Sequence, residues 1–271
     1  MLLAIRSEFR KFFTTRMWWG MAIGVFAAGV LFALAFAFLV AGAEMGAPGS
    51  GAPRAPGLNN PEMVKLVYTS GVSVGYLLTL AIGVLMVGSE YRHKTVTSTF
   101  LATPRRSVVM AAKVIALVGV GVFYGLVSLL GSVGTGAAVV LAKGYQPFPD
   151  SSIWRTLAMC LVVLALWALI GLGAGILIPN QVAALLVSIG VAWIVEPILG
   201  SIVAGQSWGA SVAPYFPSNA TNGVLAIDTA TLNAQTNFTP LTWWVAGLVL
   251  VGYAAVMAGI GTVLTVRRDV V

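Results

Sequence analysis

The polar side chains that could bind a partner are concentrated in one short segment, residues 88–107, which reads GSEYRHKTVTSTFLATPRRS. It combines a carboxylate with several cations and many hydroxyls, so it could form ion pairs and hydrogen bonds with another protein. Almost wholly apolar sequence precedes and follows it. A polar segment in such a setting marks a place where the chain leaves apolar surroundings, and we expect it to be a contact surface.

A short amphipathic helix is predicted inside this segment, over residues 95–103. Val96 and Phe100 are four residues apart and Leu101 follows directly, which gives the helix one apolar edge. Pro104 ends it, because the proline ring disfavours the helical conformation at the residue before it. An exposed Phe–Leu pair would fit a groove on a partner protein. The same pattern also suits a solvated loop whose Phe100 dips into a membrane surface, and the residues alone leave both interpretations open.

Glu196 is the second candidate for chemistry, because it lies within the apolar stretch VAWIVEPILG. It is 15 residues beyond Gln181, which places it roughly 22 Å into a hydrocarbon layer about 30 Å thick. Pro197 should kink the helix at this point, and Trp193, three residues earlier, should share its face. A carboxylate next to an indole suits a cationic or amphipathic ligand. The alternative is a glutamate at a helix end, close enough to the outer interface to reach water.

Further polar residues, Lys65, Tyr68 and Thr69, stand near the start of the second apolar run. Polar groups within a membrane often mark the path of a substrate, so Tyr68 and Thr69 are further candidates for such a path. Lys65 is better explained as a lysine whose apolar stem lies along the protein while its charge reaches the interface.

The motifs of an ATP-hydrolysing or metal-dependent enzyme are missing. A P-loop ends in Gly-Lys-Ser/Thr, whereas this chain has no Gly-Lys pair and no Asp-Glu pair. His93 stands between Arg92 and Lys94, whose charges would repel a metal ion. We therefore expect no catalytic residue, no metal site and no cofactor in this chain, and we expect the single cysteine, Cys160, to be a small packed side chain.

The composition is that of a protein that crosses a membrane several times. Hydrophobic residues make up 59% of the 271 residues and charged residues only 8%, against about 25% charged in soluble domains. A helix needs about 20 apolar residues to cross the hydrocarbon core. Six such runs are predicted, over residues 17–42, 64–88, 108–142, 153–178, 182–204 and 242–266. The fold class is therefore an all-α integral membrane protein that forms one transmembrane domain over residues 1–271.

The distribution of basic residues predicts the orientation. Of the 15 lysines and arginines, eleven lie on the side that holds both termini and residues 89–106, and four lie on the other side. The positive-inside rule therefore places both termini and residues 89–106 in the cytoplasm, and residues 205–241 outside. Because the net charge of +7 resides in short loops, it reflects topology, and we expect no nucleic-acid partner.

Residues 1–16 are predicted to form an amphipathic helix that lies in the membrane interface. Its apolar residues recur at helical spacing, and its cations fall on another face. The apolar set is Leu2, Ile5, Phe9, Phe12 and Phe13, and the polar set is Arg6, Arg10, Lys11 and Thr14. Aromatic and aliphatic side chains should contact lipid while the cations reach anionic headgroups. A charged flank that merely orients the first span is the alternative.

Two stretches resemble those of one transporter family. The segment EYRHKTVTSTFLATPRRS resembles the loop between the second and third spans of type-2 ABC exporter permeases, although Lys94 stands where the family usually has glycine. The opening RSEFRKFFTTRMWW resembles the N-terminal elbow helix of the same family. Six spans, cytoplasmic termini and a long external segment, helical or re-entrant, before the last span agree with this resemblance.

The resemblance implies roles for particular residues. The loop would be the coupling helix that seats in an ATPase subunit, and its coupling positions would be Glu90, Arg92, Thr95, Phe100, Leu101, Pro104 and Arg105. The elbow would comprise Arg6, Phe9, Arg10, Lys11, Phe12 and Phe13. In that family the fifth span also helps to form the dimer interface and a lateral cavity, so Glu196 and Trp193 could serve either.

The function implied is export of a hydrophobic or amphipathic substrate, drug-like or lipid-like, with multidrug efflux as one form of it. The partners implied are an ATPase chain that holds ATP and Mg²⁺, a second permease chain and membrane lipid, in a bacterial plasma membrane. An alternative is a non-transporting membrane scaffold or sensor anchor whose cytoplasmic loop binds a regulator. A membrane-embedded enzyme is disfavoured, because the spans lack a cluster of polar catalytic residues.

Overall fold

The computed structural model describes residues 1–45, 56–93, 95, 105–206, 208–227 and 238–267, and every regular element within these ranges is helical. The helices are α1 (Leu2–Phe13), α2 (Met17–Met45), α3 (Pro61–Thr69), α4 (Val72–Arg92), α6 (Arg106–Ala142), α7 (Ser152–Leu177), α8 (Gln181–Gly190), the π-helix η1 (Val191–Val195), α9 (Glu196–Ala204), α10 (Gly209–Val212), the 3-10 helix η2 (Ala213–Tyr215), α11 (Pro217–Leu225) and α12 (Trp243–Arg267).

Six helical segments in the described ranges are long and apolar enough to cross a bilayer. They are Met17–Ala43, Pro61–Arg92, Arg106–Ala142, Ser152–Leu177, Gln181–Val203 and Trp243–Val263. The predicted all-α class and the six spans are confirmed at this level, with boundaries that agree within a few residues. The 37 residues of α6 extend over about 55 Å at 1.5 Å per residue, so this helix must tilt or project beyond a ~30 Å core.

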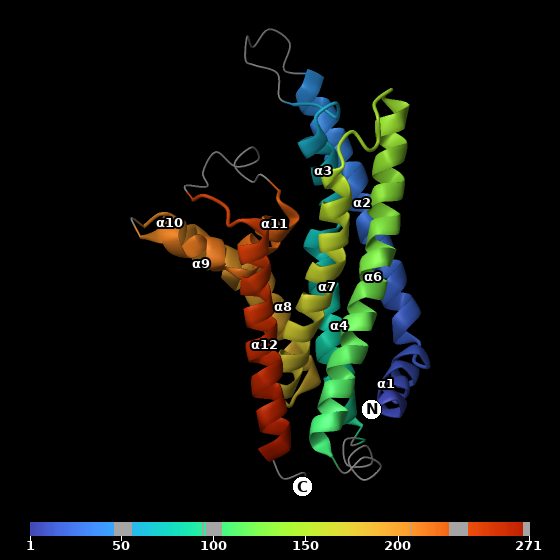
Figure 1. The fold of residues 1–271 in the computed structure, drawn as a ribbon, viewed down its shortest axis with the longest axis vertical. Coiled ribbons are helices and arrows are strands. Elements are labelled where there is room, and N and C mark those ends of the chain that lie inside the picture. Colours follow the sequence, from blue (N-terminus) through green and yellow to red (C-terminus); the bar gives the residue numbers. More distant parts are fainter. Residues whose placement is uncertain (46–55, 94, 96–104, 207, 228–237, 268–271) are drawn as a thin grey trace.

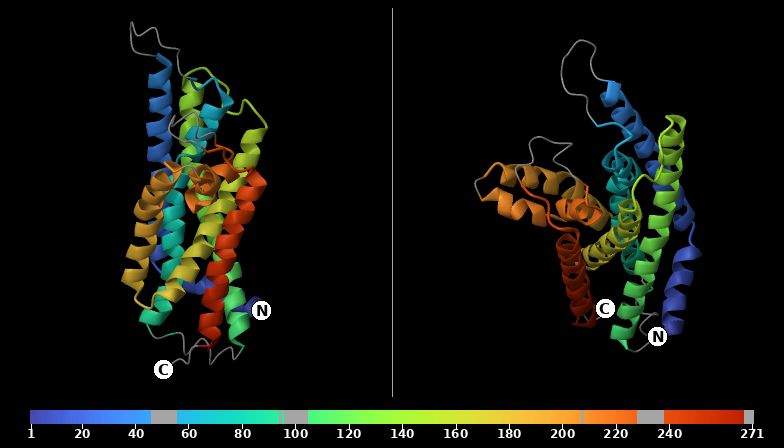
Figure 2. Two further views of the ribbon diagram at one scale, coloured as in Figure 1. Left: turned by 90° about the vertical axis from the view of Figure 1, so that its left-hand side faces the viewer. Right: turned by 45° about the horizontal axis from the view of Figure 1, so that its top comes forward.

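Four spans form the main bundle, and the last two stand beside it. The second span, α3 with α4, packs on α7, while α2 packs on α6 and α6 on α7. The last helix, α12, packs on α7 and α11, and α8 packs on α4. Figure 1 shows that the N-terminus, the last turn of α12 and the two ends of the α4–α6 connection all lie at the same end of the molecule. The helices α9 and α10 lean away from the bundle toward its opposite end (Figures 1 and 2).

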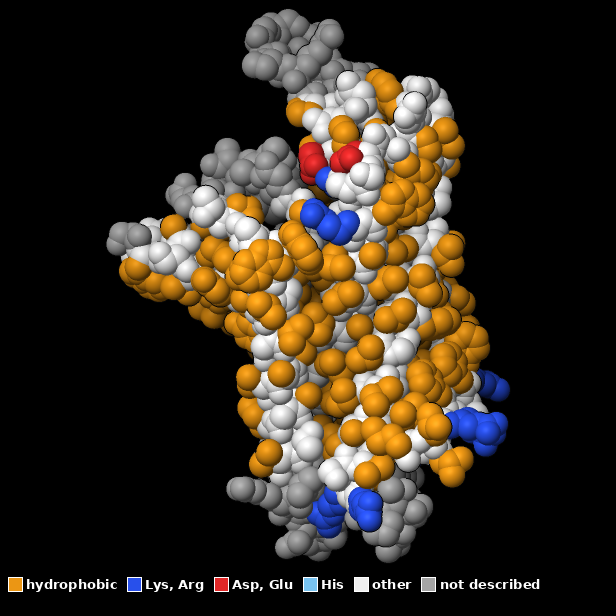
Figure 3. Space-filling view, viewed as in Figure 1, with side chains coloured by type: hydrophobic (Ala, Val, Ile, Leu, Met, Phe, Trp, Pro, Cys, Tyr) orange, Lys and Arg blue, Asp and Glu red, His pale blue; other side chains and the backbone are white. Residues whose placement is uncertain are grey.

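The surface has the pattern expected of a chain surrounded by lipid. In Figure 3 apolar side chains cover the middle of the visible face, and lysine and arginine side chains lie toward its two ends. Large apolar side chains point outward on several spans, among them Leu130 on α6 and Leu186 on α8, each 69% exposed. Such exposure would be costly in water but is favourable in a hydrocarbon layer.

Glycine permits the closest helix contact in the bundle, between α4 and α7. A side chain at Gly83 would collide with the carbonyl oxygen of Ala168, and one at Gly171 would collide with that of Leu80. The two helices can therefore touch backbone to backbone only because both positions lack a Cβ atom. Such contacts add van der Waals attraction where lipid supplies no hydrophobic driving force between helices.

We expect Gly171→Ala to lower the thermal midpoint of the purified protein. The free energy of unfolding should fall by about 1–3 kcal/mol, the usual cost of overpacking. Gly252→Ala on α12 is the matched control, because a Cβ atom there meets nothing within 4 Å. The control should be neutral or slightly stabilising, since alanine favours helices over glycine by about 1 kcal/mol. Thermal unfolding in detergent, followed by gel filtration, measures both. Equal midpoints for the two variants would contradict the close α4–α7 contact.

Candidate functional site

A cluster of four charged side chains joins three helices at the end of the molecule where the α4–α6 connection lies. The cluster, called here the ion-pair network, consists of Glu8 and Lys11 from α1, Glu90 from α4 and Lys113 from α6. The Lys113 Nζ donates to Glu8 Oε2 at 2.6 Å and to Glu90 Oε1 at 2.9 Å. The Lys11 Nζ donates to Glu8 Oε1 at 2.8 Å and to Glu90 Oε1 at 3.0 Å. Each lysine therefore bridges the same two carboxylates.

Most of this network is buried, so each of its carboxylates needs a positively charged partner. The side chains of Lys113 and Glu8 are 3% and 4% exposed, and that of Glu90 is 12% exposed. Burial raises the pKa of the Glu8 carboxyl, but the charge of Lys113 and the hydrogen bonds from Lys11 and Lys113 outweigh it, so the pKa lies below its usual value. Burial opposes the charge of Lys11 as well, yet hydrogen bonds and charges from Glu8 and Glu90 raise the pKa of Lys11 above its usual value.

Aromatic contacts also hold α1 against α6, on the same face as Glu8. Phe12 is only 3% exposed, and its ring meets that of Tyr124 edge to face, with centroids 6.1 Å apart. The ring of Phe9 occupies the space that a side chain at Gly119 would need. The prediction of a helix over residues 1–16 agrees with α1, but the expectation that its aromatic face contacts lipid is wrong for Phe12, because α6 covers that side chain.

The predicted coupling residues that the structure describes lie at or just beyond the adjoining ends of α4 and α6. Glu90 belongs to the network itself, and Arg92 is exposed at the end of α4. The backbone N–H of Thr95 donates to the Glu90 carbonyl at 3.0 Å. Arg105 is exposed directly before the start of α6. The remaining coupling positions, Phe100, Leu101 and Pro104, lie outside the described residues.

The three cations of the predicted elbow differ in whether they belong to the ion-pair network. Arg6 and Arg10 are exposed on α1, and the partly exposed Phe13 stacks on Phe9 with ring centroids 6.3 Å apart. Of these cations, only Lys11 belongs to the ion-pair network. Glu8 and Lys113 were not singled out from the sequence as site residues. The available signal was Lys113 itself, a lysine inside an otherwise apolar run, since an ionisable group at such a position requires a partner.

Two cavities lie farther along the bundle. The apolar cavity has a volume of about 340 Å³ and is bounded by α4, α7, α8, η1 and α12. Its wall includes Leu80, Trp167, Ile170 and Met257, and its polar members are Ser188, Glu196 and Tyr253. The volume and the few polar groups are typical of a site for a small apolar or amphipathic molecule.

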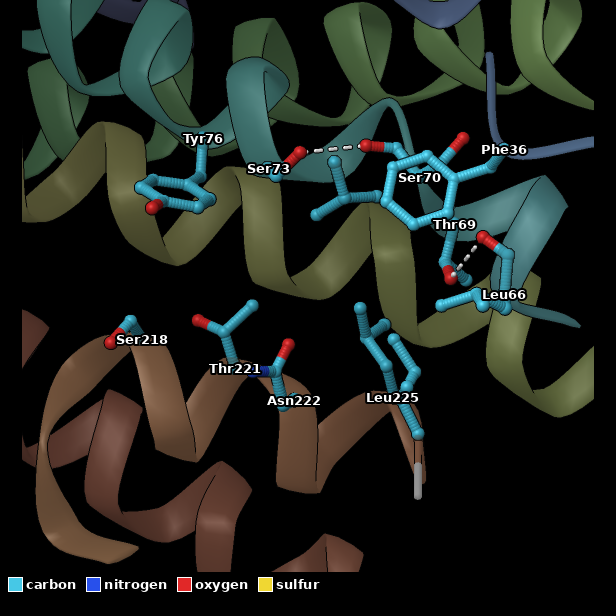
Figure 4. A pocket seen from close by; sticks show the side chains of 12 residues that line it. Phe36, Leu66, Thr69, Ser70, Ser73, Tyr76, Ser218, Thr221, Asn222 and Leu225 are labelled. Atoms are coloured by element: carbon cyan, nitrogen blue, oxygen red, sulfur yellow. Dashed lines mark hydrogen bonds between the residues drawn. The ribbon is translucent and has the colours of Figure 1, made fainter. Parts of the chain in front are cut away.

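The second cavity, called here the hydroxyl-lined cavity, has a volume of about 270 Å³. Figure 4 shows its two walls, with Thr69, Ser70, Ser73 and Tyr76 on the side of α3 and α4, and Ser218, Thr221 and Asn222 facing them from α11. Several of these hydroxyls already donate to backbone carbonyls, as Ser73 does to Ser70 at 2.7 Å. This cavity is therefore polar but largely satisfied by its own chain.

A pair of stacked rings and one end of α11 lie between the two cavities. Tyr76 lines the hydroxyl-lined cavity and Trp167 lines the apolar cavity, and their ring centroids are 4.4 Å apart. The Trp167 indole N–H donates to the Thr221 hydroxyl at 2.9 Å. The indole thus holds α11 in place while its ring forms part of the partition.

Glu196 holds the same end of α11. Its Oε1 accepts a hydrogen bond from the backbone N–H of Ser218 at 2.5 Å, near the start of a helix whose N-cap residue, Phe216, has no capping side chain. A carboxylate at this place satisfies a free N–H group and lies at the positive end of the helix dipole. Glu196 is 7% exposed, so it does not reach water as a helix-end glutamate at the interface would.

Trp193 lines neither cavity whereas Glu196 lines the apolar one, so the expectation that the two side chains share a face is wrong. Trp193 is 63% exposed while Glu196 is buried. The cause is the π-helix over Val191–Val195, in which the Glu196 N–H donates to the Val191 carbonyl five residues earlier. This wider turn ends at Val195, directly before Glu196. It changes the angle between side chains three residues apart, so Trp193 and Glu196 do not face the same way as they would in a regular α-helix.

Tyr68 and Thr69 occupy separate places. The Tyr68 hydroxyl donates to the Pro147 carbonyl at 2.7 Å and its side chain is fully buried, so it ties the second span to the α6–α7 connection. Thr69 lines the hydroxyl-lined cavity, and its hydroxyl donates to the Lys65 carbonyl at 2.8 Å. The Lys65 ammonium pairs with Glu62 at 2.7 Å. Thr69 therefore lines one cavity together with Tyr76, and Glu196 lines the other, whereas Tyr68 and Trp193 line neither.

The part of the chain that the structure describes holds no group of three or more His, Cys, Asp or Glu side chains suited to a metal ion. Comparison with known proteins adds no assignment. No model of a protein family matches the chain, and no curated protein matches it.

We expect Lys113→Met to destabilise the protein by about 3–5 kcal/mol, because it leaves the buried Glu8 and Glu90 without their shared cation. Arg6→Met on the exposed side of α1 is the control and should stay within about 0.5 kcal/mol of the parent. Combining Lys113→Met with Glu8→Gln and Glu90→Gln should restore much of the loss, since the uncompensated charges are then gone. Thermal midpoints in one detergent measure all three. A single Lys113→Met variant as stable as the Arg6→Met control would contradict the network.

The network should also give the stability a defined dependence on pH. The pKa of Glu8 is lower in the folded protein than in the unfolded chain. Its contribution to the free energy of unfolding is therefore complete above the unfolded pKa and is lost as pH falls through the folded pKa. The pKa of Lys11 is higher in the folded protein than in the unfolded chain. Its contribution to the free energy of unfolding is therefore complete below the unfolded pKa and is lost as pH rises through the folded pKa. The thermal midpoint of the parent should therefore exceed that of Glu8→Gln by a constant amount near neutral pH, and the difference should shrink in acid. A difference that persists unchanged into acid would show that the charge of Glu8 contributes nothing.

Proposed function

We propose that this chain is the membrane-spanning permease subunit of an ATP-driven exporter of the type-2 ABC class. In this proposal a separate chain hydrolyses ATP, two permease chains form the transmembrane part, and the cargo is hydrophobic or amphipathic. Six membrane-spanning segments and two cavities within the bundle support a transporter. A scaffold or sensor anchor would need the spans but would have no use for cavities of this size.

The single observation that carries the proposal is the ion-pair network. It clamps together the helices on either side of residues 93–105, because Glu90 stands near the end of α4 and Lys113 near the start of α6. The same lysine holds α1 through Glu8. A force applied to the connection between α4 and α6 would therefore move α1, α4 and α6 as one body rather than fraying the ends of the two helices.

The helix α4 gives that movement a route to the cavities. Its far end carries Tyr76, which lines the hydroxyl-lined cavity, and Leu80, which lines the apolar one. Between the network and these residues α4 is tightly held on α7 through Gly83. A displacement at Glu90 would accordingly reach both cavities and the ring partition along one rigid helix.

The energy source in this proposal lies on another chain. The sequence lacks the Gly-Lys pair of a P-loop, so ATP and Mg²⁺ would be held by the partner. The α4–α6 connection would face the cytoplasm and form the contact with that partner through Phe100 and Leu101. The helix α1, with exposed arginines beside its packed aromatic face, would be the interfacial elbow in the cytoplasmic leaflet of a bacterial plasma membrane.

The proposal is tested by co-purifying this chain with candidate ATPase chains that carry a P-loop, beginning with any that a neighbouring gene encodes. We expect a stable complex whose ATP hydrolysis is stimulated by substrate. Phe100→Ala and Leu101→Ala should each weaken it by about 2 kcal/mol, or roughly 30-fold, as is typical of an apolar anchor at the centre of a small interface. Ser98→Ala removes a hydroxyl from the same segment and should have little effect.

The variants should still insert and purify in normal yield, because neither position belongs to a span. Basal hydrolysis by the isolated ATPase should also be unchanged. If both apolar variants bind and stimulate the ATPase like the parent, the segment is not the coupling contact. If no P-loop chain binds at all, the scaffold or sensor interpretation takes its place.

A further inference from the structure

The apolar cavity contains a buried hydroxyl that has no hydrogen-bond partner. The side chain of Ser188 is on α8, lines this cavity and is 9% exposed. Within the described part of the chain, no donor or acceptor contacts its Oγ. Leaving such a group unsatisfied costs about 1–3 kcal/mol, so a bound molecule that hydrogen-bonds with Ser188 would gain from this contact.

The second buried polar group in this cavity is the carboxyl group of Glu196. It is held by Ser218 at the start of α11, and among the described residues it takes part in no ion pair. An ionised carboxylate in a low-dielectric setting costs several kcal/mol unless a cation compensates it. The ion-pair network shows how this chain treats buried carboxylates elsewhere, since Glu8 and Glu90 each contact two lysines. No lysine or arginine among the described residues forms such an ion pair with Glu196.

The remaining wall suits an organic cation. Trp167 and Tyr253 present aromatic rings, which attract cations through their faces. Leu80, Ile170 and Met257 supply apolar surface for a hydrocarbon or aromatic body. An anion of similar shape would meet the carboxylate with no described cation to offset the repulsion.

The cavity can be reached from within the bilayer. Val187 and Val191 on one side are 50% and 49% exposed, and Tyr253 on the other side is 40% exposed, so the wall between α8 and α12 faces the surrounding lipid. Tyr253 is ten residues from the start of α12 at Trp243, or about 15 Å along the helix. This depth lies near the middle of the hydrocarbon layer, where an amphipathic molecule dissolved in the membrane could enter sideways.

We propose that the apolar cavity binds an amphipathic organic cation. Its charged nitrogen lies at Glu196, and its apolar body lies against Trp167 and Ile170. A second polar group of the molecule hydrogen-bonds with Ser188, because Ser188 and Glu196 are eight residues, or about 12 Å, apart along the span. The view of this cavity as a transport site rests on the proposed function, whereas the binding itself does not.

The test uses the purified chain alone, in lipid nanodiscs, with two fluorescent probes. Dansylcadaverine carries one primary ammonium, and its N-acetylated form has nearly the same body without the charge. We expect saturable binding of dansylcadaverine, above that of empty nanodiscs, at least about tenfold tighter than binding of the acetylated probe, because one compensated charge in a desolvated site is worth that much. Equal binding of the two probes would overturn the proposal.

Three variants locate the site. Glu196→Gln keeps an oxygen that can accept from Ser218 but removes the charge, so it should abolish the preference for the cation. Val187→Trp fills the half-exposed mouth and should abolish binding of both probes with little risk to folding. Ser201→Ala, whose hydroxyl donates to the Ile198 carbonyl on the exposed face of α9, is the control and should bind like the parent. A Glu196→Gln variant that keeps the preference, or a Val187→Trp variant that binds normally, would place the probe elsewhere.

Because this assay contains no ATPase, its outcome is separate from that of the co-purification experiment. Cation binding without an ATPase partner would leave a cation-binding membrane protein that is not an ABC permease. An ATPase complex without cation binding would leave a permease for a different class of substrate.

Discussion

A buried lysine determines how the helices at one end of this molecule must be arranged. Lys113 is nearly inaccessible within an apolar helix, and a charge in such a place is tolerable only with paired, hydrogen-bonded counterions. Glu8 and Glu90 meet that need from helices that are far apart in the sequence. As a result, contacts within this chain alone hold α1 and α4 against α6. The aromatic packing of Phe12 on Tyr124 then extends the contact along α1.

The rest of the bundle transmits this constraint because α4 is held along most of its length. Gly83 and Gly171 allow α4 and α7 to meet backbone to backbone, so α4 cannot shift without displacing α7. Both helices contribute to the partition between the cavities, α4 through Tyr76 and α7 through Trp167. The charged end of the molecule and its cavities are thus connected by two tightly packed helices, which gives a physical basis for coupling between them.

The two buried carboxylate sites serve different purposes in this fold. In the ion-pair network each glutamate meets two lysines, so the local charge is balanced and the site stabilises one arrangement. At Glu196 the carboxylate meets a backbone N–H group and lies beside an apolar cavity. The first arrangement makes a rigid joint. The second leaves a charge that a mobile ligand can complete, next to a helix end that the same charge holds in place.

The sequence by itself determined the all-α class, the six spans and the helix at residues 2–13, because hydropathy and helical spacing act locally and a bilayer admits few alternatives. It also pointed to Glu196 as a charge in an unusual setting, whereas Glu90 was named only through the resemblance to a transporter family. Only the tertiary structure paired Glu8 with Lys113, which are 105 residues apart, since no local rule specifies which distant helices meet. It also decided that Glu196 faces inward and Trp193 outward, because a π-turn rotates the span. Residues such as Phe12 and Trp167 look alike as apolar positions in sequence, and only the packing of neighbouring helices distinguishes a lipid-facing side chain from one that forms the core.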